Sequence, residues 1–201
     1  MVPGSSPGGG TILLYVKMMI EKQDYSSYKH FGHLTVVPED VLRNLSDYYD
    51  KVNKQTPNTF SPNYTQWYVQ TSNPPNQVSD YEWIHWNDDD QLLITKNFFR
   101  NFVKDIIRFR FSLLDKTHRV DYHFKHFLPR IHIPLNNSDS IFVIRDEKGE
   151  HFYPTEYGNA YFVNVTLDHK VIPTKPVDRK NSFFCFTEFV GEVADRFKDT
   201  L

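Results

Sequence analysis

The C-terminal half of the chain contains five short segments rich in aromatic and β-branched residues, and this pattern constrains the fold more than any other feature. Such residues favour β-strands, and the Asn, Asp, Gly and Pro residues between the segments favour turns. Strands of this length and spacing are typical of an antiparallel sandwich or barrel. The segments span residues 109–114, 130–135, 140–145, 160–165 and 182–187.

The N-terminal half has a helical pattern instead. In residues 39–52, apolar side chains recur every three or four positions behind two acidic residues, as in an amphipathic helix. The same periodicity in residues 88–107 predicts a second helix, and residues 188–199 are expected to form a third. The stretch 55–80 contains four prolines and only a short strand candidate at 66–69, so most of it is predicted to be a loop.

These segments are expected to form one domain of class α+β behind a flexible leader. The 201 residues of the chain suffice for one sizeable core. Residues 1–10 hold four of the eight glycines and two of the twelve prolines, a composition that cannot nucleate a core. The domain is therefore expected over residues 11–201, with helical support over about 38–107 and a β core over about 108–187.

Charge, cysteine content and hydropathy disfavour several classes of protein. The 23 basic and 25 acidic residues give a net charge of −2, which disfavours a general nucleic-acid binder. A single cysteine, Cys185, cannot form an intramolecular disulfide, which indicates a reducing compartment. The apolar run at residues 11–20 is interrupted by Lys17 and is shorter than the roughly 20 residues that a membrane-spanning helix needs. We therefore expect a cytoplasmic protein that binds neither nucleic acid nor membranes.

Six of the nine histidines fall in the predicted β region. Histidine is the commonest metal ligand, so a metal site is one explanation for them. A single histidine on a strand is more often a hydrogen-bonded surface or core residue, and clustering alone leaves both explanations open. The six are His118, His123, His126, His132, His151 and His169.

The order of histidine and arginine in this region resembles the aspartyl/asparaginyl β-hydroxylase family. The resemblance rests on residues 111–135, on Gly158, and on His169 with Arg179 ten residues later; its most specific part is the Arg-Ile-His-Ile-Pro block at 130–134. It covers about residues 107–187 and, more loosely, the helices before them. Members of that family are Fe(II)- and 2-oxoglutarate-dependent oxygenases. The resemblance implies a double-stranded β-helix core, a cupin-like jelly roll, with N-terminal helices packed on it.

The resemblance also implies roles for individual residues. It makes His123 and His169 the iron ligands, and it places the contacts to the cosubstrate 2-oxoglutarate at Ser112, Arg130, His132 and Arg179. The arginines suit this role because a guanidinium binds a carboxylate through two parallel hydrogen bonds. Residues 130 and 132 would lie on the same face of a strand, so both can line one pocket.

One position departs from the family pattern. Many relatives carry His-x-Asp at the proximal site, where the aspartate completes a facial triad of two histidines and a carboxylate. Here Lys125 takes the place of that carboxylate, and an ammonium group cannot ligate iron. Three interpretations stay open: the lysine points to solvent, it pairs with an acid such as Asp121, or the site is degenerate. Asp121 could itself supply a carboxylate, although a surface acid is the simpler explanation, and His118 and His126 are expected to lie outside the ligand set.

The sequence therefore predicts a 2-oxoglutarate-dependent dioxygenase with a small-molecule or peptide substrate. By resemblance, the substrate is an Asp or Asn side chain in a peptide, or a free amino acid such as proline. Two alternatives stay open: a degenerate jelly-roll module that binds a ligand without turnover, and a cupin-type metalloprotein that does not use 2-oxoglutarate. A purely structural protein would give no reason for this order of His and Arg.

Overall fold

The computed structural model describes most of the chain. The residues described are 25, 27–57, 59–61, 64–72, 83–86, 90–116, 120–123 and 128–198, and of these the side chains are not described in 59–61, 71–72, 83–86 and 120–123. The expected leader, residues 1–10, lies outside this set.

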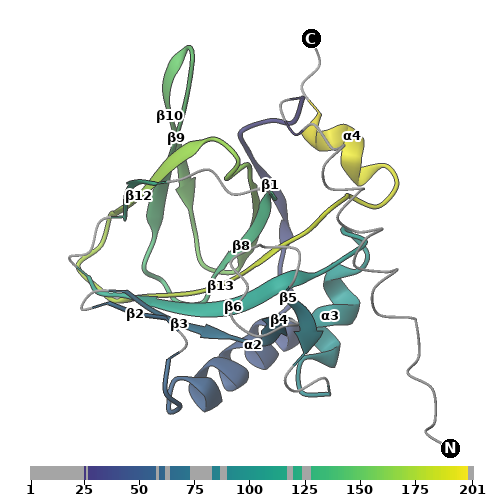
Figure 1. The fold of residues 1–201 in the computed structure, drawn as a ribbon, viewed down its shortest axis with the longest axis vertical. Helices are drawn as coiled ribbons and strands as arrows, with labels where there is room; N and C mark the ends of the chain where they lie inside the picture. Colours follow the sequence, from purple (N-terminus) through teal and green to yellow (C-terminus); the bar gives the residue numbers. More distant parts are fainter. Residues whose placement is uncertain are drawn as a thin grey trace, which may run out of the picture.

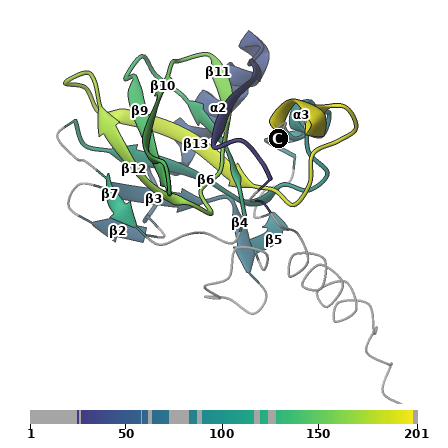
Figure 2. The same cartoon turned by 90° about the horizontal axis from the view of Figure 1, so that it is seen from above.

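Two antiparallel sheets face each other and form the body of the molecule (Figures 1 and 2). The larger sheet has the strand order β1 (Phe31–Val36), β11 (Asn159–Val163), β8 (Arg130–Pro134), β13 (Arg179–Cys185), β6 (Ile107–Leu114), β3 (Tyr64–Tyr68) and β2 (Thr59–Ser61). The smaller sheet has the order β10 (Gly149–Thr155), β9 (Ser140–Asp146), β12 (Asp168–Pro173) and β7 (Val120–His123). A separate pair contains β4 (Gln70–Ser72) and β5 (Trp83–Trp86).

The path of the chain through β6 to β13 is that of a double-stranded β-helix. Strands β6, β8, β11 and β13 lie in the larger sheet, while β7, β9, β10 and β12 lie in the smaller one, so the chain crosses repeatedly from one sheet to the other. With helices packed outside the strands, the fold is α+β with a jelly-roll core, and the fold class predicted from the sequence is confirmed.

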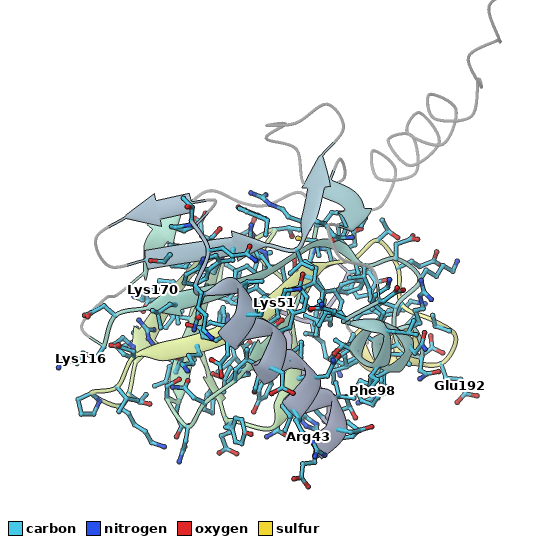
Figure 3. The ribbon with its side chains drawn as sticks, turned by 90° about the horizontal axis from the view of Figure 1, so that it is seen from below. Arg43, Lys51, Phe98, Lys116, Lys170 and Glu192 are labelled. Carbon is cyan, nitrogen blue, oxygen red and sulfur yellow. The ribbon has the colours of Figure 1, made fainter. Side chains whose placement is uncertain are left out.

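The main hydrophobic core lies between the larger sheet and the helices. Helix α2 (Glu39–Val52) runs across the outer face of this sheet, as Figure 3 shows. Its Tyr48 and Tyr49 rings pack on Phe111 of β6, with centroids 5.7 and 6.0 Å away. Helix α3 (Leu93–Phe99) lies beside α2, held by a 2.8 Å hydrogen bond from Thr95 to Asn44. Burial of these aromatic rings on one face of the sheet leaves the opposite face toward the jelly-roll interior.

The apolar periodicity of residues 88–107 continues beyond the helix that it predicted. Helix α3 ends at Phe99, and Ile107 already belongs to β6. The backbone between them turns and pairs with residues 188–190: the Lys104 amide donates to the Glu188 carbonyl, and the Val190 amide donates to the Phe102 carbonyl. The apolar residues after Phe99 therefore lie in a turn and in β6, and they are buried or partly buried without being helical.

Two further stretches also differ from the expected pattern. The region expected as a loop, 55–80, contains β2, β3 and β4, and the C-terminal helix α4 (Val193–Phe197) is shorter than the expected 188–199. Its Phe197 ring stacks on Phe189, with centroids 4.8 Å apart.

None of the helices in the described part of the chain has the length and apolar character needed to cross a lipid bilayer.

Phe111 should be among the residues that stabilise this core most. Replacing a fully buried phenylalanine by alanine removes buried apolar area and leaves a cavity, so Phe111→Ala should lower the free energy of unfolding by about 3–5 kcal/mol. Phe152, which is 58% exposed on β10, provides the matched control, and Phe152→Ala should have a much smaller effect. Urea unfolding followed by fluorescence measures both, and equal losses would contradict this description of the core.

Candidate functional site

A cavity of about 300 Å³ lies inside the jelly roll, between the two sheets. This is near the lower end of the volumes of pockets that bind small molecules. Its walls come from both sheets and include the residues Tyr64, Ser112, Leu114, Arg130, His132, Ser140, Phe142, Val163, Val165, His169, Val171, Arg179, Asn181 and Phe183.

The two-residue period of the strands explains how polar residues reach this cavity. Side chains alternate between the two faces of a strand, so those at even and odd positions have different surroundings. In β6, Phe109 and Phe111 belong to the outer core, whereas Ser112 lines the cavity. In β8, Ile131 and Ile133 lie in that core, and the residues on either side of Ile131 face inward.

The cavity brings together five of the six residues that the sequence singled out. Ser112, Arg130, His132, His169 and Arg179 all line it, and they come from four different strands. The sixth, His123, lies on β7, where only the backbone is described. His118, Lys125 and His126 lie outside the described residues.

Two arginines make the cavity cationic. Arg179 is only 1% exposed; burial lowers the pKa of its guanidinium, while nearby Asp115 acts in the opposite direction. Arg130 stands over the Phe183 ring at 5.4 Å, and its buried Nε and Nη2 atoms have no hydrogen-bond partner among the described residues. No carboxylate occurs among the described residues that line the cavity. Buried N–H groups of this kind require an acceptor, and an anionic ligand would supply one.

The neutral polar groups of the cavity are also oriented inward. The Ser112 hydroxyl is buried without a hydrogen-bond partner in the described part of the chain. Burial, together with the charges of Arg130 and Arg179, lowers the pKa of His132 to about 3, so its ring is neutral at physiological pH. The ring meets Phe142 edge-on, with centroids 4.8 Å apart. A neutral imidazole offers one N–H donor and one acceptor to a ligand.

His169 is held in an orientation suited to metal binding. It is 1% exposed, and its Nδ1 lies 2.9 Å from the Leu167 carbonyl oxygen. A carbonyl oxygen can only accept a hydrogen bond, so Nδ1 carries the proton, and the lone pair of the neutral ring is at Nε2. This is the arrangement by which many proteins orient a metal-ligating histidine.

The strand register brings His169 and His123 together. Strands β12 and β7 are antiparallel, and the Cα atoms of His169 and His123 are direct partners in this pair. The two positions are 46 residues apart in the sequence but neighbours in the sheet. Asp121, the acid considered beside Lys125, lies on the same strand β7.

Sequence reasoning missed several residues of the cavity wall. Asn181 lies two positions after Arg179 on β13, so the two-residue period of that strand could have identified it. Tyr64 belongs to β3, in the stretch expected as a loop, and burial raises its pKa. A second group of ionisable residues, His30, Asp146 and His151, lies outside the cavity lining and had no sequence signal as a group.

Comparison with known proteins identifies what this fold resembles. No family model matches the sequence, and no curated protein matches it. An oxidoreductase of the 2OG-Fe(II) oxygenase family from Burkholderia pseudomallei has a similar structure over 92% of this chain and 94% of its own, with a TM-score of 0.58 and 10% sequence identity. A prolyl-4-hydroxylase from Pseudomonas putida is similar over 85% of this chain and 98% of its own, with a TM-score of 0.53 and 14% identity. At this level of identity the similarity establishes a shared fold.

The depressed pKa of His132 should make stability depend on pH. Between the folded pKa of about 3 and the unfolded value near 6.5, the unfolded chain binds a proton at this residue that the folded chain does not. Its contribution to stability is therefore complete above pH 6.5 and is lost as the pH falls, by up to about 1.4 kcal/mol per pH unit. The free energy of unfolding of metal-free protein, measured from pH 6.5 to 4.5, should fall more steeply for wild type than for His132→Gln. Parallel curves would contradict the neutral, buried state of this ring.

Proposed function

We propose that the chain is an Fe(II)- and 2-oxoglutarate-dependent oxygenase that hydroxylates an amino-acid side chain. One observation carries the proposal: the jelly-roll cavity gathers two arginines, Arg130 and Arg179, beside an oriented, buried His169. A cationic wall next to a metal-ligating nitrogen suits an anionic cosubstrate that must also reach a metal ion. The shared fold with two oxygenase structures supports this assignment.

His123 and His169 would hold the iron. Directly opposed residues of an antiparallel pair have Cβ atoms about 4.5–5.5 Å apart, a spacing from which two imidazoles can reach one ion. The hydrogen bond from His169 Nδ1 to Leu167 directs Nε2 away from the backbone. With 2-oxoglutarate and O₂, a bound Fe(II) supplies the oxidation of an unactivated C–H bond, coupled to decarboxylation of the cosubstrate to succinate and CO₂.

The arginines, Ser112 and His132 would bind 2-oxoglutarate. Arg130 and Arg179 each present a planar set of N–H donors, which suits the carboxylates of a dianion. The partnerless Ser112 hydroxyl and the neutral His132 ring provide further hydrogen bonds without adding charge. A cavity of about 300 Å³ is adequate for a small dicarboxylate, and Phe142 and Phe183 add apolar surface to its walls.

The substrate is proposed to be an amino-acid side chain. The resemblance of residues 107–187 to the aspartyl/asparaginyl β-hydroxylases supports Asp or Asn in a peptide. The similar structure from Pseudomonas putida is a prolyl-4-hydroxylase, which supports proline as a second candidate. A gain of one oxygen atom, read by mass spectrometry on peptides containing each residue and on free proline, would distinguish these substrates.

Lys125 supports one competing function, a jelly-roll module that binds a carboxylate ligand without turnover. Its position is that of the carboxylate in many relatives of the resembled family, so the protein must use two histidines, recruit another carboxylate such as Asp121, or lack iron. The competing function predicts binding of 2-oxoglutarate with no release of succinate.

Succinate release and iron content across a Lys125 series test the oxygenase directly. If two histidines suffice, wild type releases succinate under aerobic conditions with Fe(II) and 2-oxoglutarate, and Lys125→Gly keeps or raises this activity by removing a cation from the sequence position of the family's carboxylate ligand. If the site is degenerate, wild type is inactive, and Lys125→Asp raises iron affinity by completing a facial triad. Loss of activity in Lys125→Gly would show that the Lys125 ammonium itself contributes to the reaction. No iron-dependent succinate from any of the three proteins would contradict the proposed oxygenase.

The iron ligands can be tested by removing them one at a time. His123→Ala and His169→Ala each remove one of two proposed nitrogen ligands, so Fe(II) affinity at this site should fall by at least about tenfold while the far-UV circular dichroism stays unchanged. His33, an exposed residue of β1 that contacts Asn159, is the matched control. Anaerobic titration with Fe(II), together with succinate release, measures the effect. Wild-type iron binding and activity in both variants would exclude these ligands.

Arg179 should set the affinity for 2-oxoglutarate. Arg179→Lys retains the charge but loses the bidentate geometry, so the apparent affinity for 2-oxoglutarate should fall by at least about tenfold, while metal binding stays near wild type. Arg43→Lys on the solvent side of α2 is the control (Figure 3). Calorimetric titration measures the affinity of both variants for 2-oxoglutarate. An unchanged affinity in Arg179→Lys would contradict this role and indicate that Arg130 binds the carboxylate instead.

A further inference from the structure

A group of two histidines and one aspartate lies at the turn end of the β9–β10 hairpin, outside the cavity. His30 immediately precedes β1, Asp146 ends β9, and His151 lies on β10. One potential ligand atom from each residue lies within 4.8 Å of the other two. His30 Nε2 is 3.3 Å from Asp146 Oδ2, and His151 Nε2 is 3.0 Å from Asp146 Oδ1.

Interactions outside the cluster already hold Asp146 and His30. Asp146 Oδ1 accepts hydrogen bonds from the amides of Lys148 and Gly149, at 2.7 and 3.1 Å, within the hairpin turn. Gly149 has φ of +128°, a conformation that only glycine adopts readily, so this turn requires a glycine at position 149. Because the turn fixes Oδ1, Oδ2 is the oxygen directed at His30.

His30 contacts the chain after β11 and also β10. The His30 carbonyl accepts a 2.9 Å hydrogen bond from the Asn164 amide, which ties it to the end of β11. Phe31, the next residue, stacks on Tyr153 of β10 with a centroid distance of 4.9 Å and an interplanar angle of 9°. The Tyr153 hydroxyl also lies 3.4 Å from His30 Nδ1, where it can orient the ring of a ligand histidine.

We propose that His30, Asp146 and His151 bind a divalent metal ion of the zinc class, separate from the iron proposed at His169. Two imidazole nitrogens and one carboxylate oxygen suit Zn²⁺, Co²⁺, Ni²⁺ or Fe²⁺, whereas Mg²⁺ and Ca²⁺ prefer oxygen ligands alone. Tetrahedral Zn²⁺ with bonds of about 2.1 Å needs ligand atoms about 3.4 Å apart, so side-chain rotations alone close the site. The three side chains are 18–33% exposed, which lets an ion enter from solvent and leaves room for water as a fourth ligand.

Such an ion cross-links the two sheets. His30 adjoins the edge strand of the larger sheet, and the other two ligands belong to the hairpin of the smaller sheet (Figure 1). An ion that binds only the folded protein stabilises it in proportion to the logarithm of its concentration. The proposed site is therefore a structural clip at one edge of the jelly roll.

Cobalt titration of chelator-treated protein tests this site. To separate it from the cavity, the titration uses a protein that carries both His123→Ala and His169→Ala, with folding checked by circular dichroism. This protein should bind one equivalent of Co²⁺ with the visible absorption of a low-coordinate site, release it to Zn²⁺, and gain several degrees in thermal midpoint. Adding Asp146→Asn or His151→Gln should weaken binding at least tenfold, whereas His33→Gln should leave it unchanged.

Two outcomes would overturn the proposal: no Co²⁺ or Zn²⁺ binding, or binding that the Asp146 and His151 substitutions do not affect. Anomalous diffraction at the zinc edge from wild-type crystals locates the ion without any substitution. An inactive protein without iron at His169 would refute the proposed oxygenase and leave this site standing, so the two failures are distinguishable.

Discussion

Side chains alternate between the two faces of β6, β8 and β13, and this alternation positions both the hydrophobic core and the cavity lining. One face of these strands packs against α2 and α3 and buries aromatic rings, and the opposite face lines the jelly-roll interior. The interior receives Arg130 and Arg179 as a result, and burial lowers the pKa of Arg179. Burying charge costs several kcal/mol unless compensating partners are present. The buried Nε and Nη2 atoms of Arg130 have no hydrogen-bond partner among the described residues, and the proposed anionic cosubstrate would supply acceptors for them.

Most of the β core could be predicted from the sequence because its strands carry strong local signals. β8 and β9 match the aromatic and β-branched runs closely, and helix α2 begins and ends where its periodicity does. β10 and β12 fall outside the five runs because each begins with polar or charged residues, so the aromatic and β-branched signal is weaker there. The helix expected over 88–107 was overextended, since the periodicity of Phe102 and Val103 is satisfied equally well by a turn whose backbone pairs with residues 188–190.

Local sequence patterns explain only part of the cavity lining. Arg130 and His132 share a strand, so their common face follows from the two-residue period. The pairing of His123 with His169 depends on the order of strands in the smaller sheet, which no local pattern encodes. The cluster at His30, Asp146 and His151 joins segments more than a hundred residues apart, so only the tertiary structure could bring it to attention.

The proposed oxygenase requires that the cavity bind a dicarboxylate beside a metal ion held by His169. A crystal structure with 2-oxoglutarate and Mn²⁺, a redox-stable substitute for Fe(II), tests it most directly. We expect metal density at His169 Nε2 and a carboxylate within hydrogen-bond distance of Arg179 or Arg130. A cavity without ligand density at saturating concentrations, with any bound metal confined to His30, Asp146 and His151, would contradict it.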